Sequence, residues 1–180
     1  MDPKLILNIG GGPTRQLPSH YAGWNQHLLD IDPNANPDIL CDALDLSVLD
    51  TYDAVYTSHT LEHFYKHDLP KVMKNIYNCL KRDGVVEIYV PDIKELVSRL
   101  AHSSLDIHDV YYRLSDGSPV TYHDVLYGWN IAMSKGNLYY AHRCGFTGLS
   151  LAASLQEAGF DEILVSSDGA NIKGLATKKS

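Results

Sequence analysis

Residues 5–14 read LILNIGGGPT, and residues 28–32 read LLDID. Each stretch contains a continuous apolar run, which is typical of a parallel strand buried on both faces of a sheet. The first run ends in three glycines, which tolerate a positive φ and let a ligand approach the backbone closely. The second ends at Asp30, whose carboxylate can accept both hydrogens of a ribose diol. This pair predicts a Rossmann-like sheet that binds a ribose-containing cofactor.

The turn after the glycines indicates which kind of cofactor is bound. Dinucleotide sites use a G-x-G-x-x-G turn that enters a helix, and the amino end of that helix binds the pyrophosphate. Here the third glycine of that pattern is absent and Pro13 follows the triplet, while Pro18 limits any helix beginning at Thr14 to about one or two turns. A cofactor with a ribose but no phosphate fits this turn better. A plain glycine turn between two ordinary strands is the alternative, and the acid at the expected offset disfavours it.

Composition restricts the class of protein. The chain has 180 residues, 44% of them hydrophobic, which suits one domain with a full core. A net charge of −7 repels a phosphate backbone, so we expect no nucleic-acid partner. Cys41, Cys79 and Cys144 share no close spacing, which indicates reduced thiols rather than disulfides or a metal site. No signal peptide or membrane-spanning run is recognisable, so we expect a cytoplasmic protein without a membrane partner.

Strands and helices are expected to alternate along the chain. The expected strands lie at 4–9, 27–31, 38–41, 52–57, 85–90, 160–165 and 172–177, and the expected helices at 68–80, 93–100 and 147–158. Asp68 is expected to cap the first of these helices, and Asp83-Gly84 to end it. The pattern predicts an α/β fold, Rossmann-like and doubly wound, with a seven-stranded and mostly parallel sheet.

Residues 101–146 interrupt this alternation with a polar, aromatic-rich segment between the fifth strand and the last helix. Such an insertion in a regular α/β core is typical of a lid or substrate-binding segment within a single domain covering residues 1–180. A small satellite core made of the aromatic side chains is the alternative interpretation.

Several short motifs carry a family resemblance: the glycine turn at 10–12, Asp30, Cys41-Asp42-Ala43, YDAV at 52–55 and LKRDGV at 80–85. In their order and spacing the chain resembles the class I S-adenosylmethionine-dependent methyltransferases over nearly its whole length. It is most similar to the small bacterial-type members whose fourth strand leads into a Leu-Glu-His step, here Leu61-Glu62-His63. The resemblance implies S-adenosyl-L-methionine as the cofactor.

The resemblance also implies which residues bind that cofactor, and they are Asn8, Gly10, Gly11, Gly12, Asp30, Ile31, Asp42, Ala43, Ser58 and His59. The glycine motif from Asn8 would lie against the ribose and methionine portions, and Asp30 at the ribose. Asp42 and Ala43 would contact the adenine edge, while Ser58 and His59 would flank the methionine carboxylate and the sulfonium. Asn8 departs from the family pattern, because an Asp or Glu is common at that position.

Methyl transfer requires alignment of the nucleophile with the methyl group and often removal of a proton. For a hydroxyl acceptor a neutral histidine is the natural base, because its pKa lies near the working pH. His59 and His142 are the first candidates, since His59 lies near the expected sulfonium and His142 where the insertion rejoins the core. A structural role for each histidine is the alternative. The Glu62-His63 pair is equally compatible with a structural hydrogen bond and with a catalytic dyad.

The expected function is therefore methylation of a small molecule or sugar intermediate, at oxygen, with a histidine base. The Asn-Pro-Pro-Tyr step of nucleic-acid amino methyltransferases does not follow the fourth strand. A non-catalytic protein of the same fold that binds S-adenosylmethionine or S-adenosylhomocysteine is the alternative that Asn8 suggests. A nicotinamide-dependent oxidoreductase is a third possibility, which the missing glycine opposes. The oligomeric state stays open.

Overall fold

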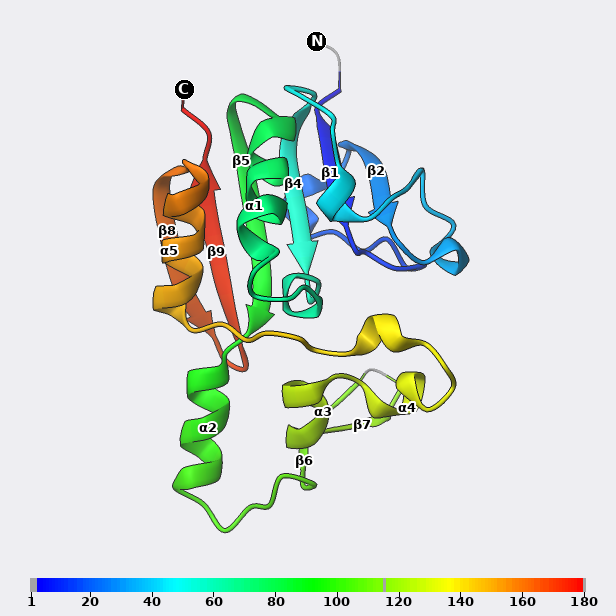
Figure 1. The fold of residues 1–180 in the computed structure, drawn as a ribbon, viewed down its shortest axis with the longest axis vertical. Helices are drawn as coiled ribbons and strands as arrows, with labels where there is room; N and C mark the ends of the chain where they lie inside the picture. Colours follow the sequence, from blue (N-terminus) through cyan, green and yellow to red (C-terminus); the bar gives the residue numbers. More distant parts are fainter. Residues whose placement is uncertain (1–2, 115, 180) are drawn as a thin grey trace.

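The computed structural model describes residues 3–114 and 116–179, and its centre is a sheet of seven strands (Figure 1). They lie in the order β3-β2-β1-β4-β5-β9-β8. Their bounds are Leu5–Ile9 for β1, Asn25–Asp30 for β2, Ile39–Leu40 for β3, Tyr52–Ser58 for β4, Leu80–Pro91 for β5, Asp161–Asp168 for β8 and Asn171–Thr177 for β9. Strands β1 to β5 are parallel, and β9 is antiparallel to β5 and β8. This confirms the expected Rossmann-like α/β fold.

Two helices cover one face of the sheet, α1 (Leu69–Cys79) and α5 (Gly148–Ala158) (Figure 1). They bury apolar side chains at helical spacing, such as Val72 and Ile76 of α1, against the buried residues of β1, β4 and β5. On the opposite face a smaller cluster forms around Ile6, Tyr21 and Ala54, where the short helix η1 (Ser19–Tyr21) contacts the sheet.

Helix α1 differs from the expectation at both of its ends. Asp68 has helical backbone angles, φ −87° and ψ −23°, and its side chain makes no capping bond. A capping side chain needs an extended backbone at that position, so the expected Asp68 cap is wrong. The helix ends at Cys79 because Leu80 is already extended and pairs with Tyr52 in the sheet. Asp83-Gly84 therefore lies inside β5, where Asp83 takes a positive φ of 61° beside a register shift.

The segment after the glycine turn contains no helix beginning at Thr14. Residues 12–15 instead form a turn in which the Arg15 amide donates to the Gly12 carbonyl, and the chain continues into η1. The rings of Tyr21 and Trp24 then pack against the sheet. Pro18 precedes η1, which is consistent with the limit that prolines impose on this segment. Apart from the start of β5, the other expected bounds differ from the observed ones by a few residues at most.

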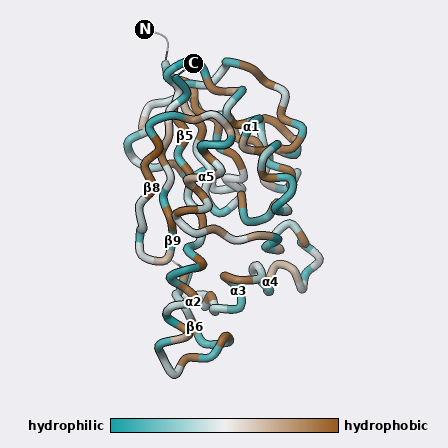
Figure 2. Tube along the Cα trace, turned by 60° about the vertical axis from the view of Figure 1, so that its left-hand side comes forward, coloured by the Kyte–Doolittle hydropathy of each residue, from teal (hydrophilic) through white to brown (hydrophobic). Residues whose placement is uncertain are grey.

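The segment between β5 and α5 lies below the carboxyl ends of the parallel strands (Figures 1 and 2). It contains helix α2 (Ile93–Ala101), the hairpin of β6 (Val110–Arg113) and β7 (Pro119–Thr121), and the short helices α3 (Tyr122–Tyr127), α4 (Asn130–Met133) and η5 (Leu138–Tyr140). Leu96, Val120, Tyr122 and Val125 form a small core of their own. The insertion, residues 101–146, therefore folds together with α2 and lies where ligands bind in open parallel sheets. Among the described residues no helix is both long and apolar enough to cross a membrane.

Candidate active site

A cleft of about 200 Å³ opens at the carboxyl ends of β1, β2 and β4. Of the residues expected to bind the cofactor, those that line it are Gly10, Gly12, Asp30, Ile31, Asp42, Ala43 and His59. The lining does not include Asn8, Gly11 or Ser58. We refer to this cleft as the cofactor cleft. Most of the residues expected from the sequence to bind the cofactor therefore line this one cavity.

The glycine turn needs glycine at two positions. Gly10 and Gly12 have φ of +70° and +57°, in the left-handed region that favours glycine. A Cβ on Gly10 would also overlap the side chain of Thr60, which lies directly against it. The Gly10 amide donates to the Leu29 carbonyl at 2.8 Å. The turn is therefore held between β2 and the segment that follows β4.

Asp30 anchors the same turn from the end of β2. One carboxylate oxygen accepts from the Gly12 amide at 3.2 Å, and the other accepts from the Asp32 amide at 3.0 Å. An ionised carboxylate has about four lone-pair sites, so each oxygen keeps a site for a ligand hydroxyl. Asp42 has a similar arrangement, because it accepts from the Leu44 amide at 2.9 Å and begins the short helix η3 (Ala43–Asp45).

Asn8 supports the turn from behind instead of lining the cleft. Its side chain is fully buried, and its amide donates to the Gln16 carbonyl at 3.4 Å. A Cβ on Gly11 would overlap this side chain, which explains a glycine at that position. A neutral amide suits the site, because a buried carboxylate beside a carbonyl oxygen would be costly. The departure from the family pattern at Asn8 is thus compatible with an intact turn.

A second cleft, of about 290 Å³, lies between the sheet and the insertion, and we call it the acceptor cleft. Aromatic side chains from the insertion dominate its wall, among them Tyr111, Tyr112 and Trp129. The hydroxyl of Tyr111 and the indole nitrogen of Trp129 are buried without a hydrogen-bond partner among the described residues. The two clefts share three lining residues, which are His59, His63 and Tyr140. The shared residues therefore form the boundary between the two cavities.

His59 follows the last residue of β4 and turns the chain with a positive φ of 52°. Its ring is 45% exposed, and its Nδ1 lies 3.3 Å from Oε1 of Glu62, a side chain that is only 1% exposed. This is an ion-pair distance, although neither Glu62 oxygen has hydrogen-bond geometry with any described group. Burial lowers the pKa of His59, but the Glu62 carboxylate outweighs it and raises the pKa above the usual value. His59 is therefore a strengthened proton acceptor at the boundary of the clefts.

The orientation of His63 and His142 follows from their backbone partners. Nδ1 of His63 lies 3.1 Å from the Ala141 carbonyl oxygen, and Nδ1 of His142 lies 2.8 Å from the Val125 carbonyl oxygen. Because a carbonyl only accepts, each Nδ1 carries the proton and each neutral ring presents an unprotonated Nε2. Burial is the main cause that lowers the pKa of His142, which keeps that ring neutral. The two rings meet edge to face with centroids 4.9 Å apart.

The end of the insertion is attached to the segment after β4. The Glu62 carbonyl in helix η4 (Leu61–His63) accepts from the amides of Arg143 and Cys144, at 2.8 and 3.2 Å. Near the other side of the cofactor cleft, Asn137 of the insertion donates to Asp32 at 3.3 Å. The insertion therefore contacts the wall of the cofactor cleft at two places.

Sequence reasoning missed three residues that line the cofactor cleft, Thr60, Tyr140 and Arg143. His63 lines the same cleft, and Glu62 lies beneath His59. The Leu-Glu-His step pointed to Glu62 and His63 but was equally compatible with a structural pair. Tyr140 and Arg143 flank His142 in the sequence, and only the folded insertion shows that they reach the cofactor cleft.

A family model described as a methyltransferase domain matches residues 2–165. No curated protein sequence matches the chain significantly. Human N-acetylserotonin methyltransferase in complex with S-adenosylmethionine is similar in structure, with a TM-score of 0.62 and 16% identity over 98% of this chain and 48% of that protein. A 1,6-didemethyltoxoflavin-N1-methyltransferase from Burkholderia thailandensis, solved with bound 1,6-didemethyltoxoflavin and S-adenosylhomocysteine, has a TM-score of 0.60 and 16% identity over 99% of this chain and 72% of its own.

A third similar structure is described as a possible exported protein from Bordetella parapertussis. It has a TM-score of 0.60 and 16% identity, and the match covers 99% of this chain and 63% of that protein. The present chain thus spans about half to three quarters of the length of these proteins, and at such identities the likeness shows the fold alone. The family match supports the enzyme class and the cofactor that the sequence led us to expect. The chain belongs to the methyltransferase domain family and shares the fold of the two methyltransferases described above.

Proposed function

We propose that this protein methylates a hydroxyl oxygen of a small molecule, either an aromatic compound or a sugar intermediate, with His59 as the general base. The observation that carries this proposal is the boundary between the two clefts, where His59 lines both the cofactor cleft and the acceptor cleft. His142 lines the acceptor cleft alone, so we propose His59 rather than His142 as the base.

The residues of the cofactor cleft fit S-adenosylmethionine. The free lone pairs of Asp30 suit a ribose diol, and the tight glycine turn at Gly10 and Gly12 brings the backbone close to the ligand. Asp42 and Ala43 line the same cleft, and we propose that they contact the adenine edge. Arg143 is the only arginine or lysine among the lining residues, which suits it to the carboxylate of the methionine portion.

The bound cofactor supplies a methyl group on a positively charged sulfur, which makes that carbon open to in-line attack. In the proposed reaction the bond between the acceptor oxygen and the methyl carbon forms as the sulfur–carbon bond breaks. The electron pair of the broken bond stays on sulfur, and S-adenosylhomocysteine results. His59 takes the hydroxyl proton, and the Glu62 carboxylate 3.3 Å away stabilises the imidazolium that forms.

We propose residues 101–146 as the lid or substrate-binding insertion of one domain. The tyrosine and tryptophan rings of the acceptor cleft suit stacking on a flat ring or covering the apolar face of a sugar. The net charge of −7 disfavours nucleic acid as acceptor. Free Cys41, Cys79 and Cys144 are compatible with a reducing, cytoplasmic setting. The Leu61-Glu62-His63 step supports membership of the small bacterial-type subgroup.

The test combines cofactor binding with turnover. Calorimetry with S-adenosylhomocysteine measures binding, and S-adenosylhomocysteine formation is followed over a panel of phenols, catechols and sugars. For an accepted substrate, His59→Ala is expected to lower the rate about 100-fold or more, because the base is lost, while cofactor affinity is retained. His67→Ala is the matched control, since its ring is 79% exposed and lies outside both clefts.

Two results would contradict the proposal. Full activity of His59→Ala would exclude this histidine as the base. Tight binding of S-adenosylhomocysteine without turnover of any hydroxyl compound would favour a non-catalytic binding protein of the same fold.

A further inference from the structure

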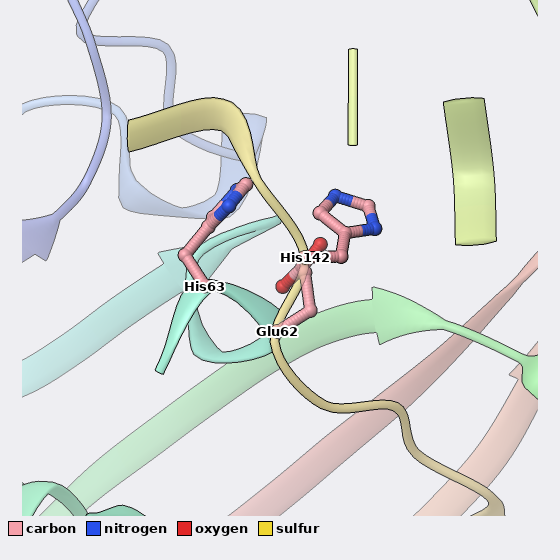
Figure 3. A group of neighbouring side chains, drawn as sticks. All are labelled: Glu62, His63 and His142. Atoms are coloured by element: carbon pink, nitrogen blue, oxygen red, sulfur yellow. The ribbon is translucent and has the colours of Figure 1, made fainter. Parts of the chain in front are cut away.

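Three side chains, two at the wall of the acceptor cleft and one buried beside it, approach one another. Glu62 and His63 belong to η4, and His142 belongs to the segment that leaves the insertion (Figure 3). One ligand atom from each lies within 4.8 Å of the other two. His63 and His142 also line the acceptor cleft. The group therefore combines two imidazole rings and one carboxylate beside a cavity.

Both histidines are oriented as metal ligands usually are. Each donates its Nδ1 proton to a backbone carbonyl, of Ala141 for His63 and of Val125 for His142, and so presents the Nε2 lone pair. In metal sites this second hydrogen bond fixes the tautomer and the direction of the ring. With Nδ1 bonded to a carbonyl, Nε2 is the ring atom that each histidine can offer to a cation.

The carboxylate of Glu62 is buried and has few polar partners. The residue is 1% exposed, and neither carboxylate oxygen has a hydrogen bond from any described group. Its nearest basic group is His59, whose Nδ1 lies 3.3 Å from Oε1. A buried carboxylate is stable only when it is paired or coordinates a metal. With two oxygens, Glu62 can contact His59 through one and a cation through the other.

From these contacts we propose that Glu62, His63 and His142 bind a divalent transition-metal cation. Imidazole with carboxylate suits ions such as Zn²⁺, Co²⁺ or Fe²⁺, whereas Mg²⁺ prefers an all-oxygen set. In a tetrahedral site with bonds of about 2.1 Å the ligand atoms lie about 3.4 Å apart, so small side-chain rotations suffice to close the observed group. Three protein ligands leave at least one position open for a further oxygen.

The open position gives the cation a role in the proposed reaction. A hydroxyl or phenolate oxygen of the acceptor bound there would be held at the boundary with the cofactor cleft, and its pKa would fall. This role rests on the proposed function, whereas the cation site itself does not. His59 is not part of the ligand group, so it stays available as the base.

The experiment measures metal binding with neither cofactor nor acceptor present. Chelator-treated protein is titrated with Co²⁺, and the visible absorption of bound Co²⁺ is recorded before and after competition with Zn²⁺ or Mg²⁺. We expect saturation at one Co²⁺ per chain, displacement by Zn²⁺, and no displacement by equimolar Mg²⁺. His142→Ala and Glu62→Gln are expected to weaken Co²⁺ binding at least about tenfold. His67→Ala, an exposed histidine outside the group, is expected to bind as the wild type does.

Two variants and a check of their folding make the Co²⁺ titration decisive. His142 lies at a cleft wall, so its truncation leaves the main core intact, and thermal unfolding without metal checks the fold of each variant. If Glu62→Gln fails to fold, His142→Ala alone decides. The proposal is overturned if the wild type binds no Co²⁺ saturably, if His142→Ala binds it equally well, or if Mg²⁺ competes equally. If metal-free protein still transfers methyl groups, the cation has no role in catalysis, but the Co²⁺ titration still decides whether the cation site exists. The two proposals can therefore be overturned separately.

Discussion

The carboxylate of Asp30 connects the backbone of the glycine turn with the space where a ribose would lie. Asp30→Ala is expected to weaken binding of S-adenosylhomocysteine by about 1–3 kcal/mol, because two hydroxyls lose their acceptor. Asp30→Asn keeps one acceptor oxygen, so its loss is expected to be smaller. Calorimetry measures both, and Asp161→Ala, at the exposed start of β8, is the control. An unchanged affinity in Asp30→Ala would remove the ribose assignment.

At the scale of elements, the turn between β1 and η1 tolerates added side chains poorly. Gly10→Ala is expected to lower the free energy of unfolding by about 2–3 kcal/mol, because positive φ strain adds to the overlap with Thr60. Gly23 has a φ of +84°, but a Cβ added there would have no heavy atom within 4 Å. Gly23→Ala is therefore expected to lower the free energy of unfolding by only the backbone strain of about 1 kcal/mol. Urea unfolding of both variants separates overlap from strain. Equal losses would show that Thr60 moves aside freely.

The elements that could be predicted are those whose signal is local. The buried strand β1 shows an apolar run, β4 carries apolar Ala54 and Val55 at its centre, and α1 and α5 show helical spacing, so each was expected close to its observed position. The start of β5 was missed because Lys81, Arg82 and Asp83 are exposed and resemble a turn, although Leu80 is already paired with Tyr52. The Asp68 cap failed because the backbone at Asp68 is helical, which composition does not reveal.

The candidate site was predictable only in part, for the same reason. Gly10, Gly12 and Asp30 are fixed by strand ends, and their meeting in one cleft follows from parallel pairing of β1 and β2. Glu62 and His142 lie in distant parts of the chain, and their approach depends on backbone bonds from Arg143 and Cys144. No sequence spacing encodes those bonds, so the group of two histidines and a glutamate emerges only after folding.

Across the whole molecule, Glu87 joins parts of the chain that are far apart in sequence. It is 1% exposed at the centre of the sheet, with Lys173 of β9 and His20 of η1 each 2.8 Å from its carboxylate. Burial would raise the pKa of Glu87, but contacts with Lys173, His20 and Tyr21 outweigh it and lower the pKa below 4.5. The folded pKa lies below that of the unfolded chain, so the stabilisation is present above pH 4.5 and is lost as the pH falls.

Glu87→Gln should therefore lower the free energy of unfolding by about 2 kcal/mol at neutral pH, because charged hydrogen bonds are lost. The difference from wild type should shrink as the pH falls below 4.5 and the wild-type carboxylate becomes protonated. Urea unfolding at several pH values measures this, with exposed Glu157→Gln as the control. A difference that stays constant with pH would assign the loss to packing rather than charge.

The amides of Arg143 and Cys144 donate hydrogen bonds to the Glu62 carbonyl and so hold the end of the insertion in place. The rest of the insertion is freer to vary in sequence. The end of the insertion is attached to the same short helix that follows β4, whereas α2, β6, β7 and α3 have their own small core. Residues on the outer part can therefore be exchanged without displacing His59 or the glycine turn. Under the proposed function, grafting of that outer part alone is expected to change the acceptor preference while the cofactor cleft is retained.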